Sequence, residues 1–121
     1  MSDKIIAVMR KIISVPDHIS DICQEDTEFY FKFGDHVFSV TKRSDDRFGE
    51  YSLYFYPKFN GFTEDLAEQY RYGSAEDINM LAYHESEYSV NEKSLFKELY
   101  TLIEERFLGA DKAFDDILSS Y

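Results

Sequence analysis

The chain has 121 residues, of which 44% are hydrophobic and 31% charged, and its 24 acidic against 13 basic residues give a formal net charge of −11. A chain of this length has room for one stable core, so we expect a single α+β domain over residues 1–121. The negative charge would repel a phosphate backbone or an anionic membrane, which argues against direct binding to either.

The N-terminal segment has the spacing of an amphipathic helix. Apolar residues recur at three- and four-residue intervals over residues 2–13, and the helix is expected to end before Pro16. The segment that follows, residues 16–23, is expected to add one short helical turn that buries Ile19 and Ile22.

Residues 27–42 carry the clearest pattern in the chain, two alternating runs separated by a Gly-Asp pair at 34–35. A two-residue turn of type II′ there would pair Phe31 with Phe38 and place every apolar partner on one face. Residues 51–57 alternate in the same way and supply a third strand. The pattern therefore predicts a three-stranded antiparallel meander.

Residues 61–73 are predicted to form a short helix that Thr63 caps and that directs Leu66 and Tyr70 inward. The segment after it is ambiguous in pattern. Ser74 could cap one further helical turn, and residues 79–85 could form a fourth strand.

Residues 89–109 have the pattern of a long helix. Ser89 and Glu92 form a capping box at its start, and Gly109 stands where a left-handed C-terminal cap is expected. A final short helix over residues 110–121 is expected to bury its apolar side chains, which are Phe114, Ile117 and Leu118.

The order of these elements separates strands from helices, which predicts the fold class. We expect an α+β fold, a three- or four-stranded antiparallel β-meander with N-terminal and C-terminal helices packed on one face. The opposite face of the sheet, to which Tyr30, Tyr54 and Tyr56 point, is then expected to be open to solvent.

Motifs for catalysis or metal binding are weak. The glycines form neither a phosphate-binding loop nor a nucleophile elbow. His84 would point away from Glu85 on a strand, and no histidine or cysteine pair has metal-ligand spacing. Cys23 lies beside an inward-facing isoleucine and is expected to act as a small apolar side chain. We therefore expect no enzyme, no cofactor and no metal site.

Acidic residues concentrate in the second half of the chain. Residues 1–59 hold 10 acidic and 8 basic residues, a net of −2, whereas residues 60–121 hold 14 and 5, a net of −9. Tyrosines are interleaved with these carboxylates, and tyrosine is favoured at protein interfaces while acidic groups steer a basic partner. The candidate partner-binding residues are Glu64, Asp65, Glu68, Tyr72, Glu76, Asp77, Tyr83, Glu85, Glu87 and Tyr88.

These features favour a non-enzymatic binding protein that neutralises a basic protein partner, in the manner of a bacterial immunity or inhibitor protein for a nuclease-type toxin. Its carboxylates would pair with lysine and arginine of the partner while tyrosines anchor the contact. One cysteine, no signal peptide and no long apolar run favour the cytoplasm.

Two other classes of function stay open. One is a DNA-mimic regulator of the anti-restriction or anti-CRISPR type, whose carboxylates would be spaced like phosphates. The other is a small enzyme or ligand-binding domain with a pocket between sheet and helices, which would need a concave site containing His84 or Cys23.

Overall fold

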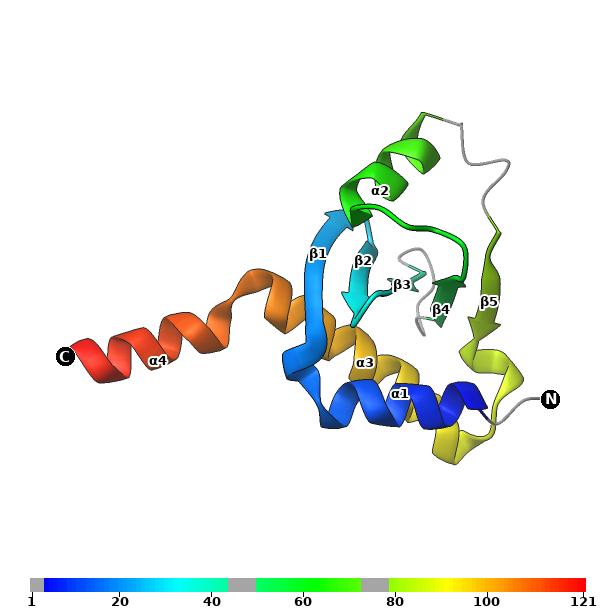
Figure 1. Ribbon diagram of the computed structural model, residues 1–121. Helices are drawn as coiled ribbons and strands as arrows, with labels where there is room; N and C mark the ends of the chain where they lie inside the picture. The colour runs from blue at the N-terminus through cyan, green and yellow to red at the C-terminus, as the bar shows by residue number, and fades with distance from the viewer. Residues whose placement is uncertain (1–3, 44–49, 73–78) are drawn as a thin grey trace.

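The computed structural model describes residues 4–43, 50–72 and 79–121. Within these ranges the chain forms four α-helices, five strands and two short 3₁₀ turns, η1 and η2. Their bounds are α1 Lys4–Ser14, η1 Pro16–His18, β1 Ile19–Glu25, β2 Glu28–Phe33, β3 His36–Lys42, β4 Tyr51–Tyr56, α2 Thr63–Arg71, β5 Leu81–His84, η2 Glu85–Glu87, α3 Val90–Leu108 and α4 Ala110–Ser120. Figure 1 shows α2 on one side of the sheet, α1 and α3 on the other, and α4 extending away from the body.

The sheet is antiparallel throughout and its strands follow chain order, β1-β2-β3-β4-β5. The predicted register of the central hairpin is confirmed, with Phe31 opposite Phe38 and Phe33 opposite His36. Gly34 has φ +60°, as the first central position of a II′ turn requires. The α+β class is therefore confirmed, with five strands in the sheet rather than three or four.

The additional strand is β1, in the segment predicted to form a helical turn. Only Pro16–His18 is helical there, and Ile19 and Ile22 pack against the core from the edge of the sheet. The register of β1 shifts between Ser20 and Cys23, where Asp21 has φ +51°. In a regular strand, residues on one face are separated by an even number of positions. The bulge instead separates Ile19 and Ile22 by three positions, a spacing that also occurs in helices, and the sequence therefore resembled a helix. The fourth predicted strand is confirmed as β5.

One core lies on the phenylalanine face of the sheet. Side chains of α1 and α3 close over it, and Met9, Ile12, Phe31, Leu53 and Leu99 have no accessible surface. Two polar contacts fasten α3 to the rest of the body: the Tyr100 hydroxyl donates to the carbonyl of Thr27, and the Arg106 guanidinium donates to the carbonyl of Pro16.

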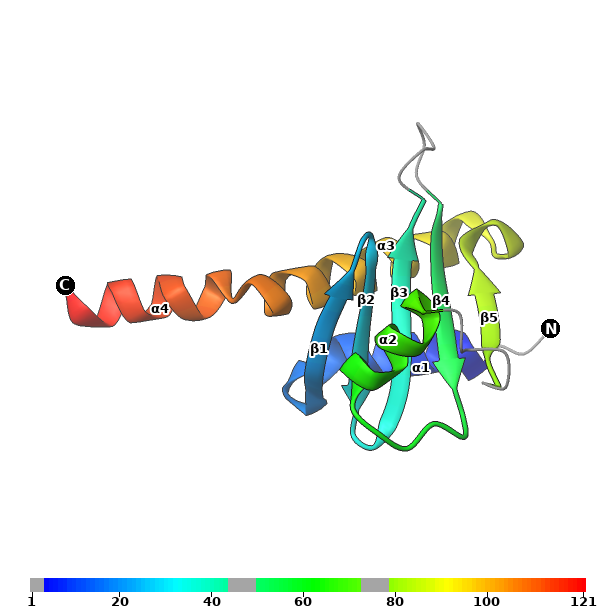
Figure 2. The same cartoon turned by 90° about the horizontal axis from the view of Figure 1, so that it is seen from above.

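A second core lies on the tyrosine face, which the sequence predicted to be open. Leu66 and Ala67 of α2 cover it, and Tyr30 and Tyr56 beneath them are each only 2% exposed. Figure 2 shows α2 lying across the strands on the side opposite α1. The expectation of an open face is wrong because the chain after β4 returns towards β1, and α2 packs there against β1 and β2.

Asp21 holds α2 in this position. Its carboxylate oxygen Oδ2 accepts a hydrogen bond from the backbone N–H of Thr63 at 2.9 Å, and its backbone oxygen accepts one from the Thr63 hydroxyl at 2.7 Å. The helix begins one residue earlier than predicted, with Phe62 rather than Thr63 as N-cap, and a phenylalanine side chain has no acceptor. The cap of α2 therefore comes from the bulge in β1.

The final helix does not bury its apolar residues, contrary to the prediction. Phe114 is 60% exposed, Ile117 55% and Leu118 81%. Gly109 ends α3 in the left-handed conformation, with φ +68°, as predicted. From there α4 continues outward instead of folding back onto the sheet (Figure 2).

We expect Asp21→Ala to destabilise the protein more than Asp26→Ala. Both positions have positive φ, +51° and +54°, so both substitutions place alanine in the same unfavourable backbone region. Only Asp21 caps α2, and loss of a cap costs about 0.5–2 kcal/mol. Urea denaturation should show a difference of this size, and equal losses at the two positions would contradict the role given to Asp21.

Candidate functional site

A polar hollow of about 570 Å³ lies on the tyrosine side of the sheet, where β3 and β5 end and β4 begins. Two cations, one carboxylate, a histidine and several hydroxyl groups line it. Residues that contribute to the lining include Thr41, Lys42, Arg43, Glu50, Ser52 and His84. This composition suits a polar or charged ligand rather than an apolar one.

Among the side chains of this hollow, Ser52 and His84 form the pair best suited to nucleophilic chemistry. They lie opposite each other on β4 and β5, and Ser52 Oγ is 2.7 Å from His84 Nδ1. The edge of the imidazole meets the Tyr54 ring at a centroid distance of 6.1 Å. A serine with histidine at this distance is the first half of an activated nucleophile. In the described part of the chain, no carboxylate is hydrogen-bonded to the imidazole to orient it.

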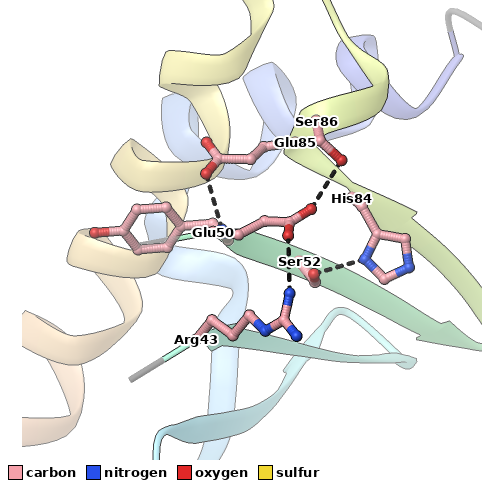
Figure 3. A network of polar contacts seen from close by, with 7 residues as sticks. Arg43, Glu50, Ser52, His84, Glu85 and Ser86 are labelled. Atoms are coloured by element: carbon pink, nitrogen blue, oxygen red, sulfur yellow. Dashed lines mark hydrogen bonds and ion pairs between the residues drawn. The ribbon is translucent and has the colours of Figure 1, made fainter. Parts of the chain in front are cut away.

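A second set of contacts secures the strand ends around this hollow (Figure 3). Glu50 Oε2 lies 3.7 Å from Arg43 Nη1, and Glu50 Oε1 accepts a hydrogen bond from Ser86 Oγ at 2.8 Å. Glu85 Oε1 accepts a hydrogen bond from the backbone N–H of Tyr51 at 3.1 Å. These contacts connect β3, β4 and η2, so Glu85 has a structural task.

The predicted partner-binding residues fall into two separate groups. Four of them lie on α2 or immediately after it and are exposed to solvent: Glu64, Asp65, Glu68 and Tyr72. Four others lie on β5, on η2 or just beyond: Tyr83, Glu85, Glu87 and Tyr88. Figure 1 shows η2 beside the start of α3, away from α2. Glu76 and Asp77 lie outside the described residues.

Most residues of the second group make contacts within the fold. Tyr83 and Tyr88 are half-buried and pack against the phenylalanine core, and the Tyr88 ring meets Phe96 at 5.3 Å. Glu85 accepts the backbone hydrogen bond described above, whereas Glu87 is exposed. The structure therefore does not bring these residues together with α2 into a single acidic face.

The outer surface of α2 combines carboxylates with exposed aromatic rings. Tyr72 is 74% exposed and Phe62 is 69% exposed, one at each end of the helix. Between them, Asp65 and Glu68 line a shallow hollow of about 520 Å³. Sequence reasoning missed Phe62, because a phenylalanine next to a helix start reads as a core residue.

The single cation of α2 is directed to β1. The Arg71 guanidinium donates to both carboxylate oxygens of Glu25, and this contact lowers the pKa of the Glu25 carboxyl group. Arg71 also lies over the Tyr72 ring, with its guanidinium carbon 5.8 Å from the ring centroid. The three carboxylates on the outer side of α2 are thus not neutralised by the arginine of their own helix.

A half-buried carboxylate, that of Glu28, lies on the tyrosine face at the start of β2. Glu28 accepts a hydrogen bond from Ser39 Oγ at 2.6 Å and one from the Tyr30 hydroxyl at 3.1 Å, and Ser39 Oγ is 2.8 Å from the Tyr56 hydroxyl. Burial raises the pKa of Glu28, which disfavours its ionised form, although both hydrogen bonds act in the opposite direction. Burial also raises the pKa values of Tyr30 and Tyr56, so both phenols stay protonated.

Cys23 offers no strong nucleophile. It is half-buried on β1 and packs against the second core. Burial raises the pKa of its thiol, and a raised pKa lowers the fraction of reactive thiolate. This environment agrees with the expectation that Cys23 acts as a small apolar side chain.

Two further findings concern the described ranges. Among residues 4–43, 50–72 and 79–121, no group of three or more histidine, cysteine, aspartate or glutamate side chains is placed to hold a metal ion. No helix in those ranges has both the length and the apolar composition that crossing a membrane requires.

No protein-family model matches the chain, and comparisons with curated proteins and with solved structures found no match.

We expect Glu28→Gln to stabilise the protein relative to the wild type as pH rises. The pKa of Glu28 in the folded state lies above its ordinary value of 4.5. The protonated Glu28 side chain therefore contributes to the free energy of unfolding below pH 4.5, and this contribution is lost as pH rises through the folded-state pKa. Glutamine does not titrate and therefore avoids this loss.

Urea denaturation from about pH 4 to about pH 8 measures the difference between the two proteins. The unfolding free energy of Glu28→Gln minus that of the wild type should increase over this range. Glu98→Gln, at an exposed position of α3, controls for the removal of one carboxylate. A difference for Glu28→Gln that stays constant or falls would show that the ionised carboxylate is not disfavoured in the folded protein.

Proposed function

We propose that this chain is a non-enzymatic acidic binding protein that neutralises a basic protein partner, as an immunity or inhibitor protein does for a nuclease-type toxin. The observation that carries the proposal is the outer surface of α2. It presents the exposed carboxylates Glu64, Asp65 and Glu68 between two exposed aromatic rings, Phe62 and Tyr72.

The two sides of α2 have separate tasks. Its inner side, with Leu66 and Ala67, closes the second core, whereas the exposed carboxylates on its outer side are not required by either core. Large aromatic side chains are typical anchors of protein interfaces, and carboxylates accelerate encounter with a cationic surface. A partner held there would have its lysine and arginine side chains covered, and a nuclease in that state could not reach nucleic acid.

The binding surface in this proposal is smaller than the set predicted from the sequence. It consists of Glu64, Asp65, Glu68, Tyr72 and the additional Phe62, while Tyr83, Glu85 and Tyr88 serve the fold. The proposed setting is the cytoplasm of a bacterium, where a chain with one cysteine would be kept reduced.

We expect the double variant Asp65→Lys/Glu68→Lys to lose the basic partner, and Glu98→Lys/Glu105→Lys to retain it. The two variants change net charge by the same amount, but Glu98 and Glu105 lie on α3, away from α2. The measurement is capture of proteins from lysate on the immobilised chain over a series of salt concentrations, followed by association rates with the captured protein.

The outcomes separate the classes of function. A single basic protein that is retained at moderate salt and is lost only with the α2 variant supports the proposal. Many basic proteins released together as salt rises would indicate a DNA mimic instead. Equal binding by the two double variants would exclude α2 as the contact surface.

One observation favours a second candidate, a small enzyme or ligand-binding domain. The Ser52–His84 pair lies in a polar hollow, which supports a concave site that contains His84, although strands and the turns beside them line this hollow rather than α-helices. In such an enzyme Ser52 Oγ would attack an acyl carbon while His84 Nδ1 takes the hydroxyl proton. The hollow and α2 are distinct, so the two candidates can be tested independently.

For this second candidate, a fluorophosphonate probe should label Ser52 covalently. Labelling requires an activated hydroxyl, so Ser52→Ala should remove it and His84→Gln should slow it strongly. Mass spectrometry of the labelled peptide identifies the modified residue. An unlabelled Ser52 in the folded wild type would leave the Ser52–His84 hydrogen bond as a cross-strand contact of the sheet.

A further inference from the structure

The helix α4 carries an apolar stripe that its own chain leaves uncovered. Phe114, Ile117 and Leu118 recur at the spacing of one helix face, and all three are more than half exposed. The helix leaves the body at Gly109, and its main contacts are with the end of α3. Figures 1 and 2 both show it extending well beyond the sheet. A stripe of this kind at the surface normally marks a contact site.

A matching apolar groove lies elsewhere on the same molecule. A hollow of about 480 Å³ opens between α1, the phenylalanine face of the sheet and β5, and carbon atoms form most of its surface. Its apolar lining includes Ile5, Val8, Phe33, Phe38, Phe55 and Leu81. Leu81 is 49% exposed, so part of this lining faces solvent. Lys4 and Lys11 of α1 also border the groove.

The groove is out of reach of α4 in the same chain. Its lining comes from α1, β2, β3, β4 and β5 and includes no residue of α3, whereas α4 begins where α3 ends. The 19 residues of α3 span about 28 Å, and the 11 residues of α4 span about 16 Å. With only Gly109 between the helices, α4 folded back along its own chain would lie against the C-terminal half of α3, which does not border the groove.

We propose that α4 of one copy of this chain docks into the groove of a second copy. The apolar stripe of the helix meets the apolar lining, and Asp115, which flanks the stripe, meets the lysines of α1 at the groove, Lys4 and Lys11. The charges are therefore complementary as well as the apolar surfaces. Each copy carries both halves of the contact, so reciprocal exchange of α4 closes a dimer.

This dimer would leave the outer surface of α2 accessible, because residues of α1 line the groove. Figure 2 shows α1 and α2 on opposite sides of the sheet. The inference therefore does not depend on the proposed function. A failure of dimerisation and a failure of partner binding would be observed with different variants.

The test is the molar mass of the full chain in solution, measured by analytical ultracentrifugation. The wild type is expected at twice the monomer mass of 14.3 kDa. Ile117→Asp on α4 and Leu81→Asp in the groove are each expected to give the monomer. Ser119→Asp adds the same charge to the opposite side of α4 and should leave the dimer intact. Thermal unfolding of each variant confirms that the body is folded.

A mixing experiment identifies the two halves of the contact. The Ile117→Asp chain keeps a working groove and the Leu81→Asp chain keeps a working helix, so a mixture of the two should form a mixed dimer although each alone is monomeric. The single variants Lys11→Glu and Asp115→Lys should each weaken the dimer. A chain that carries both substitutions should form the dimer again.

Two results would overturn the proposal. A wild type that stays monomeric at high concentration would show that α4 does not bind a second copy. A Leu81→Asp chain that remains dimeric while Ile117→Asp becomes monomeric would show that two α4 helices pair with each other instead of entering the groove.

Discussion

Asp21 stands at a bulge in the edge strand β1, and its carboxylate and carbonyl oxygens accept the two hydrogen bonds that Thr63 donates from the first turn of α2. The bulge gives Asp21 a positive φ and lets one residue serve both the strand and the helix. Through this contact the chain fixes which face of the sheet α2 covers. It also fixes which side of α2 remains outside.

The rest of the arrangement depends on that choice. With α2 in place, each face of the sheet carries a core, phenylalanines under α1 and α3, and tyrosines under α2. Tyr30 and Tyr56 need partners for their hydroxyl groups once buried, and Glu28 and Ser39 supply them. The same placement turns the carboxylates of α2 outward.

Local patterns in the sequence were enough to predict the parts of the fold that depend on neighbouring residues. The β2–β3 hairpin and the helices α1 and α3 follow from periodicity, a glycine turn and a capping box. The strand β1 was missed because the bulge at Asp21 interrupts its alternation. The position of α2 was missed because its cap lies 42 residues away in the chain.

The candidate sites show the same division. The exposed carboxylates of α2 could be predicted from charge alone, whereas the Ser52–His84 pair requires the β4–β5 register, which pattern reasoning left ambiguous. The exposure of α4 could not be predicted either. An amphipathic stripe has the same sequence whether its own body or another molecule covers it.

Hydrogen–deuterium exchange tests the central claim most directly, namely that the outer surface of α2 is where a basic protein is held. The chain is compared alone and in complex with the basic protein captured from lysate. Amides of residues 63–71 should exchange more slowly in the complex, while those of β4 and β5 keep their rates. Slower exchange confined to residues 50–54 and 84–86, with α2 unchanged, would contradict the account and place binding in the polar hollow.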